Sequence, residues 1–269
     1  MNKRPIGIFD SGVGGLTVFK EIRNRFPFED IVYFGDTARV PYGPKSKNTI
    51  IDYSVQNARF LLQKNVKVII VACNTSSAQA LPFLREKLSV PVIGVIQPGA
   101  NTAVSCSQNG RIGVIGTEGT IKSKAYQQSI QNILPNSNVF AKSCPLFVSL
   151  VEEGWEQHKI AKLVTEEYLM ELKDKAIDTL VLGCTHYPIL KLVISEVMGK
   201  EVKLIDSAEA IAQFLEKNLP EPEKEQKGSD RFYVSDNEIK FKEIASRILE
   251  KEVDLLQKVK LGESWFPDL

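Results

Sequence analysis

Short apolar runs of strand type alternate with amphipathic segments along the chain, and this alternation constrains the fold more than any other feature. Three such runs, each followed by an amphipathic segment, occupy residues 5–10 then 14–26, 30–36 then 49–65, and 66–74 then 75–88. A strand followed by a helix, repeated in this way, is the pattern of βαβ units with a parallel sheet covered by helices. The sequence therefore predicts an α/β fold.

The chain also resembles itself at a nearly constant offset. IGIFDSGVGG from Ile6 resembles IGVIGTEGTI from Ile112, a shift of 112 − 6 = 106, and the cysteines at 73 and 184 differ by 184 − 73 = 111. A looser echo links VPVIGVIQPGA from Val90 to EVKLIDSAEA from Glu201, at 201 − 90 = 111. Anchors in one order at similar offsets indicate an internal duplication. We therefore expect two α/β halves related by a pseudo-twofold.

Composition narrows the classes of partner. With 34 basic and 33 acidic residues the formal charge is +1, so no overall field favours nucleic acid or an anionic membrane. The N-terminal residues lack the apolar core of a signal peptide, and no apolar run approaches a membrane span. The four cysteines, at 73, 106, 144 and 184, form no CxxC pair. We expect a cytoplasmic protein with reduced thiols.

Two of these cysteines share a setting. Cys73 follows the run VKVIIVA and precedes Asn74 and Thr75, as at the first turn of a helix, while Cys184 follows IDTLVLG and precedes Thr185. In open parallel sheets this place, beyond the carboxyl end of a strand, is where ligands bind. A helix start lowers the pKa of a nearby thiol. A buried, inert cysteine is the alternative for one such residue, but a matched pair indicates a shared function.

Other polar residues accompany these thiols. His186 lies two residues after Cys184 and can exchange protons at neutral pH. Asp10 and Ser11 end the first predicted strand, before a glycine turn that matches neither a Walker loop nor GxGxxG, so a nucleotide site has little support. No second ligand pair with metal spacing accompanies His186, and we predict no zinc.

Two thiols facing each other across a small polar cleft suit one reaction class. One thiolate removes a proton from a carbon, and the opposite thiol delivers a proton to the other face, which inverts the stereocentre. No pyridoxal lysine motif is evident, so the thiols would work without a cofactor. A free cysteine has a pKa of about 8.5, and half ionisation at pH 7 needs a shift of about 1.5 units, roughly 2 kcal/mol.

Four blocks carry a family resemblance. FDSGVGGLTV, VPYG, VACNTSSA and LGCTHYPIL resemble the motifs of bacterial glutamate racemases, cofactor-independent enzymes that make D-glutamate for peptidoglycan, and they occur in the family's order between Ile6 and about Ala212. The resemblance implies that Cys73 and Cys184 are the paired acid and base, with Asp10, His186 and Glu152 assisting. It further implies a substrate pocket to which four of the catalytic residues, Asp10, Cys73, Cys184 and His186, contribute. The other residues implied to line the pocket are Ser11, Pro41, Tyr42, Gly43, Asn74, Thr75, Thr117, Thr120 and Thr185.

The resemblance also implies an architecture. Two flavodoxin-like domains enclose the active site between them, the first formed by residues 1–95 plus 208–269 and the second by residues 96–207. It implies no cofactor and no metal, a small-molecule substrate, and assembly as a homodimer.

Other functions remain open at this point. A racemase for aspartate or a related acidic compound would use the same thiols, because two cysteines and anion-binding turns do not determine the length of the substrate's side chain. A non-catalytic module could capture a dicarboxylate between two lobes. A thiol redox enzyme is less favoured, because its cysteines normally lie close in sequence.

Overall fold

The computed structural model describes residues 4–219 and 226–261, and it contains two parallel sheets. The first sheet has the order β10-β9-β2-β1-β3-β4 and the second has the order β6-β5-β7-β8. Every strand pair is parallel, which confirms the predicted α/β class. The strands are β1 Ile6–Asp10, β2 Ile31–Gly35, β3 Val68–Val71, β4 Val92–Gly94, β5 Arg111–Gly116, β6 Asn138–Ser143, β7 Thr179–Gly183, β8 Lys203–Asp206, β9 Asp230–Val234 and β10 Leu256–Lys258.

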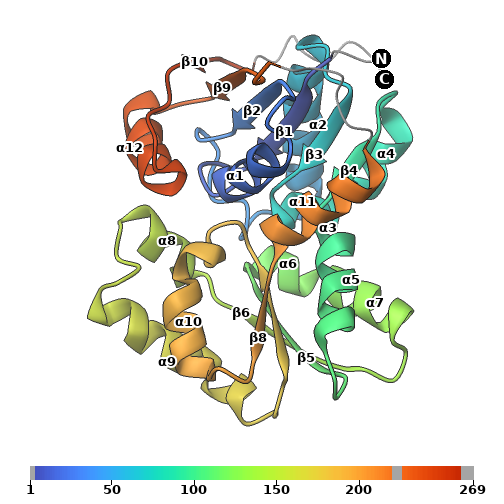
Figure 1. Cartoon of the computed structure of the whole chain (residues 1–269), viewed down its shortest axis with the longest axis vertical. Coiled ribbons are helices and arrows are strands. Elements are labelled where there is room, and N and C mark those ends of the chain that lie inside the picture. The colour runs from blue at the N-terminus through green and yellow to red at the C-terminus, as the bar shows by residue number, and fades with distance from the viewer. Residues whose placement is uncertain (1–3, 220–225, 262–269) are drawn as a thin grey trace.

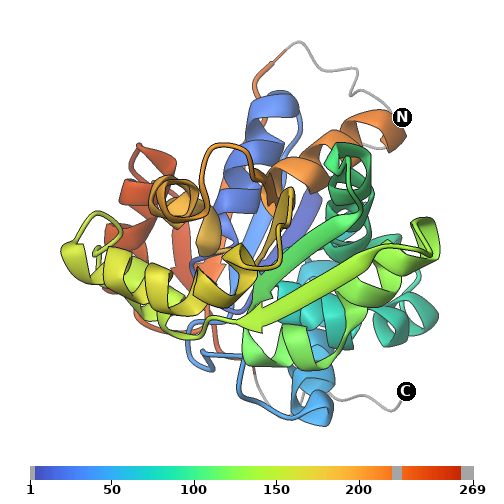
Figure 2. The same cartoon turned by 90° about the horizontal axis from the view of Figure 1, so that it is seen from below.

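Helices cover both faces of each sheet. They are α1 Leu16–Arg25, α2 Lys47–Gln63, α3 Asn74–Gln79, α4 Leu81–Lys87, α5 Ile96–Cys106, α6 Glu118–Lys122, α7 Ala125–Ile133, α8 Leu146–Glu152, α9 Lys159–Lys173, the 3₁₀ helix η1 Tyr187–Leu190, α10 Lys191–Met198, α11 Ser207–Asn218 and α12 Glu238–Leu249. The first sheet packs against α1, α11 and α12 on one face and against α2 and α4 on the other. Figure 2 shows the second sheet in the same way, between α9 and α10 on one side and α5 and α7 on the other.

We call the six-stranded sheet with its helices the first lobe, and the four-stranded sheet with its helices the second lobe. Figure 1 shows the first lobe above the second, with the loops that follow the strands between them. Strands β1, β2, β3, β5 and β7 are almost entirely buried, as expected for parallel strands covered on both faces. The hydrophobic runs found in the sequence are thus explained by double-sided burial.

The strand order repeats between the lobes. Four neighbouring strands of the first sheet follow the order β2-β1-β3-β4, and the second sheet follows the corresponding order β6-β5-β7-β8. The starts of β3 and β7 differ by 179 − 68 = 111 residues, which equals the offset of the two cysteines. The predicted duplication therefore has a counterpart in the topology.

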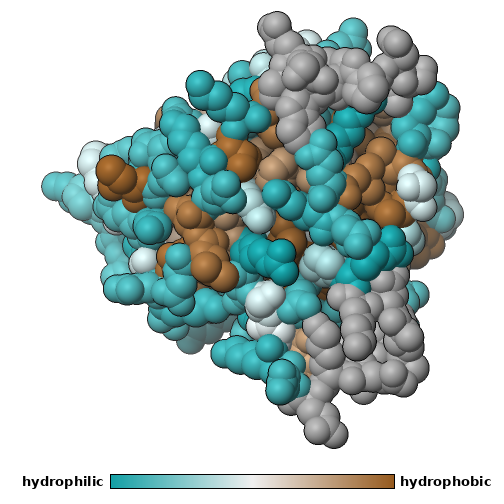
Figure 3. All heavy atoms as spheres, turned by 90° about the horizontal axis from the view of Figure 1, so that it is seen from above, coloured by the Kyte–Doolittle hydropathy of each residue, from teal (hydrophilic) through white to brown (hydrophobic). Residues whose placement is uncertain are grey.

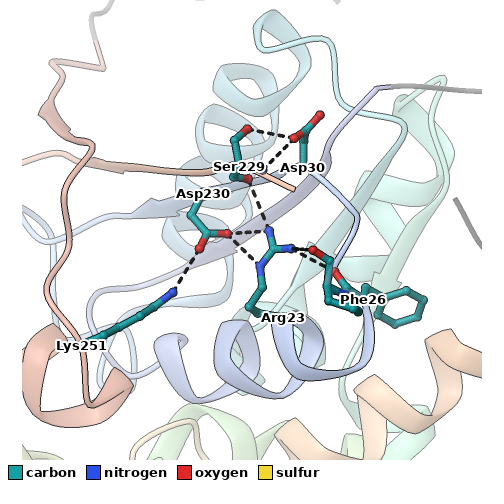
Figure 4. Close-up of polar contacts among 7 residues, drawn as sticks. Arg23, Phe26, Asp30, Ser229, Asp230 and Lys251 are labelled. Atoms are coloured by element: carbon teal, nitrogen blue, oxygen red, sulfur yellow. Dashed lines mark hydrogen bonds and ion pairs between the residues drawn. The ribbon is translucent and has the colours of Figure 1, made fainter. Parts of the chain in front are cut away.

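The C-terminal segment returns to the first lobe, where β9 pairs with β2 and β10 pairs with β9. Figure 4 shows how Arg23 of α1 holds β9: its guanidinium donates to Asp230 at 2.5 and 2.9 Å and to the carbonyl of Ser229 at 3.3 Å. Lys251 lies 3.2 Å from the other Asp230 oxygen. The predicted domain boundaries stay a prediction, and their residues 1–3, 220–225 and 262–269 lie outside the described residues.

Within the described part of the chain, none of the helices combines the length and apolar character needed to cross a membrane. The face seen from above, at the end of the first lobe remote from the second, carries hydrophobic residues between hydrophilic ones (Figure 3).

Candidate active site

The two predicted cysteines lie at matching positions of the two sheets. Cys73 follows β3 and directly precedes α3, and Cys184 directly follows β7. Strands β3 and β7 each pair with the first strand of their own repeat, β1 and β5. Both side chains are buried, with 5% and 6% of their surface exposed. Because all strands are parallel, both thiols stand at carboxyl ends, where α/β sheets bind ligands.

Both cysteines line one small cavity between the lobes. Its volume is about 30 Å³, room for only a few water molecules. The loops after β1, β2 and β3 supply one wall, and the loops after β5 and β7 together with α8 supply the other. The lining residues are Ser11, Val40, Pro41, Tyr42, Gly43, Cys73, Asn74, Thr75, Thr117, Val148, Glu152, Cys184, Thr185 and His186.

On the second-lobe side, three residues form a chain of proton-carrying groups. His186 Nδ1 lies 3.8 Å from the Cys184 sulfur, and His186 Nε2 lies 3.2 Å from Glu152 Oε1. Burial alone would lower the pKa of His186, but the hydrogen bonds and negative charges of Cys184 and Glu152 raise it to about 10. Burial would raise the pKa of Glu152, yet His186 brings it below its ordinary value. At neutral pH the ring is therefore an imidazolium between a sulfur and a carboxylate.

On the first-lobe side, Cys73 has no such cationic partner among the groups that shift its pKa. Burial and the charge of Asp10 raise the pKa of Cys73 to about 11, against the weaker opposing effect of hydrogen bonds that include the Ser11 hydroxyl. The sequence prediction of a lowered pKa at Cys73 was wrong, because desolvation outweighs the helix start. Cys73 is thus a neutral thiol in this closed site.

Asp10 links the two sides from behind the cavity. One oxygen accepts from the Gly12 N–H at 2.9 Å, and the other accepts from the Thr185 hydroxyl of the second lobe at 3.4 Å. The carboxyl is fully buried. Burial raises the pKa of Asp10, while the positive charge of His186 opposes this increase. Asp10 therefore stands in contact with the second-lobe loop rather than on the cavity wall.

Further hydrogen bonds join the lobes around the cavity. The Thr75 and Thr117 hydroxyls lie 2.8 Å apart, and the Tyr126 hydroxyl donates to Asn74 Oδ1 at 2.7 Å. The Thr17 hydroxyl donates to the Thr185 carbonyl at 3.0 Å. These contacts hold side chains from one lobe in register with those of the other.

The structure brings all but two of the predicted pocket residues onto the cavity wall. The exceptions are Asp10 and Thr120, whose hydroxyl lies 3.0 Å from that of Thr117 and 3.3 Å from that of Thr75. Tyr42 lines the cavity, but its hydroxyl donates to Asp36 and accepts from Asn57, so it anchors its loop. His158 is exposed, and Cys144 is buried in the second-lobe core.

Sequence reasoning missed two apolar wall residues, Val40 and Val148. Neither carries a polar group that could have marked it, and only the packing of the lobes places them there. Among the described residues, no group of three or more His, Cys, Asp or Glu side chains could hold a metal ion.

Comparison with known proteins agrees with this geometry. The sequence model of the Asp/Glu/Hydantoin racemase family matches residues 14–215. A glutamate racemase from Geobacter metallireducens is 52% identical over 251 residues, covering 91% of this chain and 93% of the relative. The crystal structure of a glutamate racemase isoform from Bacillus anthracis superposes with a TM-score of 0.92 at 38% identity, covering 96% of this chain and 98% of the other.

A glutamate racemase from Francisella tularensis, solved in complex with D-glutamate, gives a TM-score of 0.90 at 42% identity, over 98% of this chain and all of the other. The chain therefore belongs to the Asp/Glu/Hydantoin racemase family. Its resemblance to the glutamate racemases of that family, first seen in four sequence blocks, is confirmed by these relatives.

Proposed function

We propose that this protein interconverts L-glutamate and D-glutamate by moving one proton off and another onto the α-carbon, with Cys73 and Cys184 as the two acid/base groups. The observation that carries this proposal is the placement of two buried thiols, from matching strands of two repeats, on opposite walls of one cavity. The family relatives named glutamate racemase support the choice of substrate.

The two thiols have different neighbours before reaction. His186 Nδ1 lies 3.8 Å from the Cys184 sulfur, within reach for proton exchange, whereas burial and the charge of Asp10 raise the pKa of Cys73 and keep it a thiol. In one direction the Cys184 sulfur accepts the α-proton and its bond electrons stay on the carbon as a carbanion. That carbanion takes the proton of the Cys73 thiol on its opposite face. The product is the other enantiomer, with Cys73 left as thiolate and Cys184 as thiol, ready for the reverse direction.

The polar wall residues hold the substrate so that its α-carbon lies between the sulfurs. Ser11, Asn74, Thr75, Thr117 and Thr185 offer hydroxyl, amide and backbone groups that hydrogen-bond carboxylates and an ammonium group. When the bound substrate is held with its α-carbon near both sulfurs, proton transfer no longer needs a random collision and becomes an oriented, effectively unimolecular step. Val40 and Val148 help to exclude water from the reacting atoms.

Further properties belong to this proposal. The first domain comprises residues 1–95 plus 208–269 and the second residues 96–207, the protein works in the cytoplasm, and it forms a homodimer. Its D-glutamate would supply peptidoglycan synthesis. Size-exclusion chromatography with light scattering tests the dimer.

The assay for the reaction is optical. Each enantiomer of glutamate, and separately of aspartate, is incubated with the protein, and the optical rotation is followed. We expect the rotation of either glutamate enantiomer to decay to zero, while aspartate does not change. If the optical rotation decays with aspartate but not with glutamate, aspartate is the substrate. Tight binding of glutamate without any decay of its rotation would favour a non-catalytic binding module.

A further inference from the structure

Helix α12 of the first lobe lies beside the end of α8 in the second lobe, although residues 153–237 separate them in the sequence. Figure 1 shows α12 directly above α8 at the edge of the molecule. Two side chains of α12, Arg247 and Lys240, reach the segment in which α8 ends. The last residue of α8 is Glu152, the partner of His186.

The principal contact is made by Arg247. Its Nη2 donates to the carbonyl of Val151, and its Nε lies 3.7 Å from Glu156 Oε1. Val151 is fully buried in the second-lobe core, so its carbonyl has a fixed position. The side chains of Arg247 and Glu156 are 35% and 18% exposed, which leaves this contact partly sheltered from water.

A guanidinium at this place suits the end of a helix. The last carbonyls of a helix lack partners within it and carry partial negative charge. The Val151 carbonyl accepts from the Gly154 N–H at 3.1 Å, and the guanidinium supplies a second, charged donor. The first lobe thereby caps a helix of the second lobe one residue before Glu152.

The chain after α8 is shaped to admit the guanidinium. Gly154 has a φ of +72°, a conformation that L side chains rarely adopt, and a Cβ there would stand 2.6 Å from Arg247 Nη1. Glycine thus allows both the turn and the approach of the arginine.

Lys240 adds a second contact from the same helix. Its Nζ lies 3.6 Å from Glu153 Oε1, and its positive charge contributes to the lowered pKa of Glu152. Arg247 and Lys240 of α12 therefore both act on the segment that carries Glu152.

We propose that Arg247 is a positioning residue: by holding the last turn of α8 it fixes Glu152 against His186, and through that pair it prepares Cys184 for proton transfer. The C-terminal segment then serves the active site as well as the first sheet. This inference rests on the proposed function, in which Cys184 is one of the two acid/base groups.

The test uses a readout that does not require activity. The chain has two histidines, so NMR titration of their ring signals, assigned with the variant His158→Gln, reports His186 directly. We expect Arg247→Gln to lower the pKa of His186, in the same direction as Glu152→Gln but by less. The control Lys242→Gln removes the same charge from an exposed position of α12 and should leave the titration unchanged.

Kinetics supply the second readout. Arg247→Gln should lower kcat for glutamate racemisation about tenfold with KM changed less than about twofold, because misplacing a catalytic group by about 1 Å can cost up to about a hundredfold. The alkaline limb of the kcat–pH profile of Arg247→Gln should move to lower pH. Gly154→Ala should act in the same direction, and Arg247→Lys should restore part of the rate, since it keeps the charge without the planar fork.

The outcomes separate the two claims. If the wild-type protein fails to racemise glutamate, the proposed function is wrong. The NMR titration of His186 still tests whether Arg247 positions Glu152. If His186 titrates alike in the wild type, Arg247→Gln and Lys242→Gln, the positioning role is overturned. Should Arg247→Gln not fold, Gly154→Ala, whose added Cβ would stand 2.6 Å from Arg247 Nη1, takes its place in the titration, and an unchanged His186 there overturns the proposal.

Discussion

The backbone N–H of Gly119 in the second lobe donates to the carbonyl of Gly43 in the first lobe at 2.9 Å. Together with the Thr75–Thr117 contact, this bond closes the cavity on the side of α3 and α6. A cavity of about 30 Å³ does not admit an amino acid with a side-chain carboxylate. Substrate entry therefore requires the lobes to part at contacts such as this one.

The substitution Gly119→Ala tests this closure. A Cβ at Gly119 would stand 2.8 Å from the Gly43 carbonyl, which is backbone and cannot turn aside. We expect the added methyl group to prop the lobes apart and to raise KM for glutamate about tenfold, which corresponds to about 1.4 kcal/mol. Alanine is favoured over glycine within helices by about 1 kcal/mol, so thermal stability should not fall.

The matched control for this variant is Glu118→Gln. It changes the neighbouring residue of α6 and breaks only the ion pair with Lys122. Steady-state kinetics should give a wild-type KM for it. An unchanged KM in Gly119→Ala would show that closure does not depend on this contact.

The pKa of His186 also predicts how stability depends on pH. Its folded value of about 10 lies above its ordinary 6.5, so the stabilisation it gives is complete below about pH 6.5 and is lost as the pH rises toward 10. We expect the unfolding free energy of the wild type to fall more between about pH 6 and pH 9 than that of His186→Gln. Urea denaturation at both values measures this.

The control for that experiment is His158→Gln, which removes the exposed histidine. It should keep the wild-type slope of stability against pH. Equal slopes in all three proteins would mean that the imidazolium of His186 is not stabilised by Cys184 and Glu152.

The attachment of the C-terminal segment is expected to depend on Arg23. Its side chain is 8% exposed and that of Asp230 is 17% exposed, so removing the guanidinium leaves a largely buried carboxylate without its main partner. We expect Arg23→Ala to lower the unfolding free energy by about 3 kcal/mol. Lys162→Gln, which breaks an exposed pair with Glu196, should have little effect in the same urea titration. Equal midpoints for the two variants would contradict this.

Much of this architecture could be predicted from the sequence. Buried parallel strands give continuous apolar runs, and the internal duplication predicts matching strand ends for Cys73 and Cys184. Motif residues such as Ser11, Asn74 and Thr117 reached the cavity wall because short loops fix their positions relative to those ends.

The rest depended on how the lobes pack. The raised pKa of Cys73 follows from burial by both lobes, which a local reading of a helix start does not contain. Asp10 and Thr120 are buried and hydrogen-bonded to residues of the cavity wall, but they do not line the cavity themselves. Arg247 carries no motif at all, and its contact with Val151 joins residues that only the folded chain brings together.

The central claim is that two thiols act on opposite faces of one carbon, and proton exchange in deuterated water tests it most directly. Each glutamate enantiomer is incubated in D₂O with the wild type, Cys73→Ser, Cys184→Ser and, as a control, Cys106→Ser, whose half-buried thiol lies outside the cavity. Chiral chromatography with mass spectrometry then reports both enantiomers and their deuterium.

We expect the wild type and Cys106→Ser to form the opposite enantiomer with deuterium at the α-carbon, and both active-site variants to form it about 10³-fold more slowly. Wild-type rates in either Cys73→Ser or Cys184→Ser, or a product that retains its original hydrogen, would contradict the account.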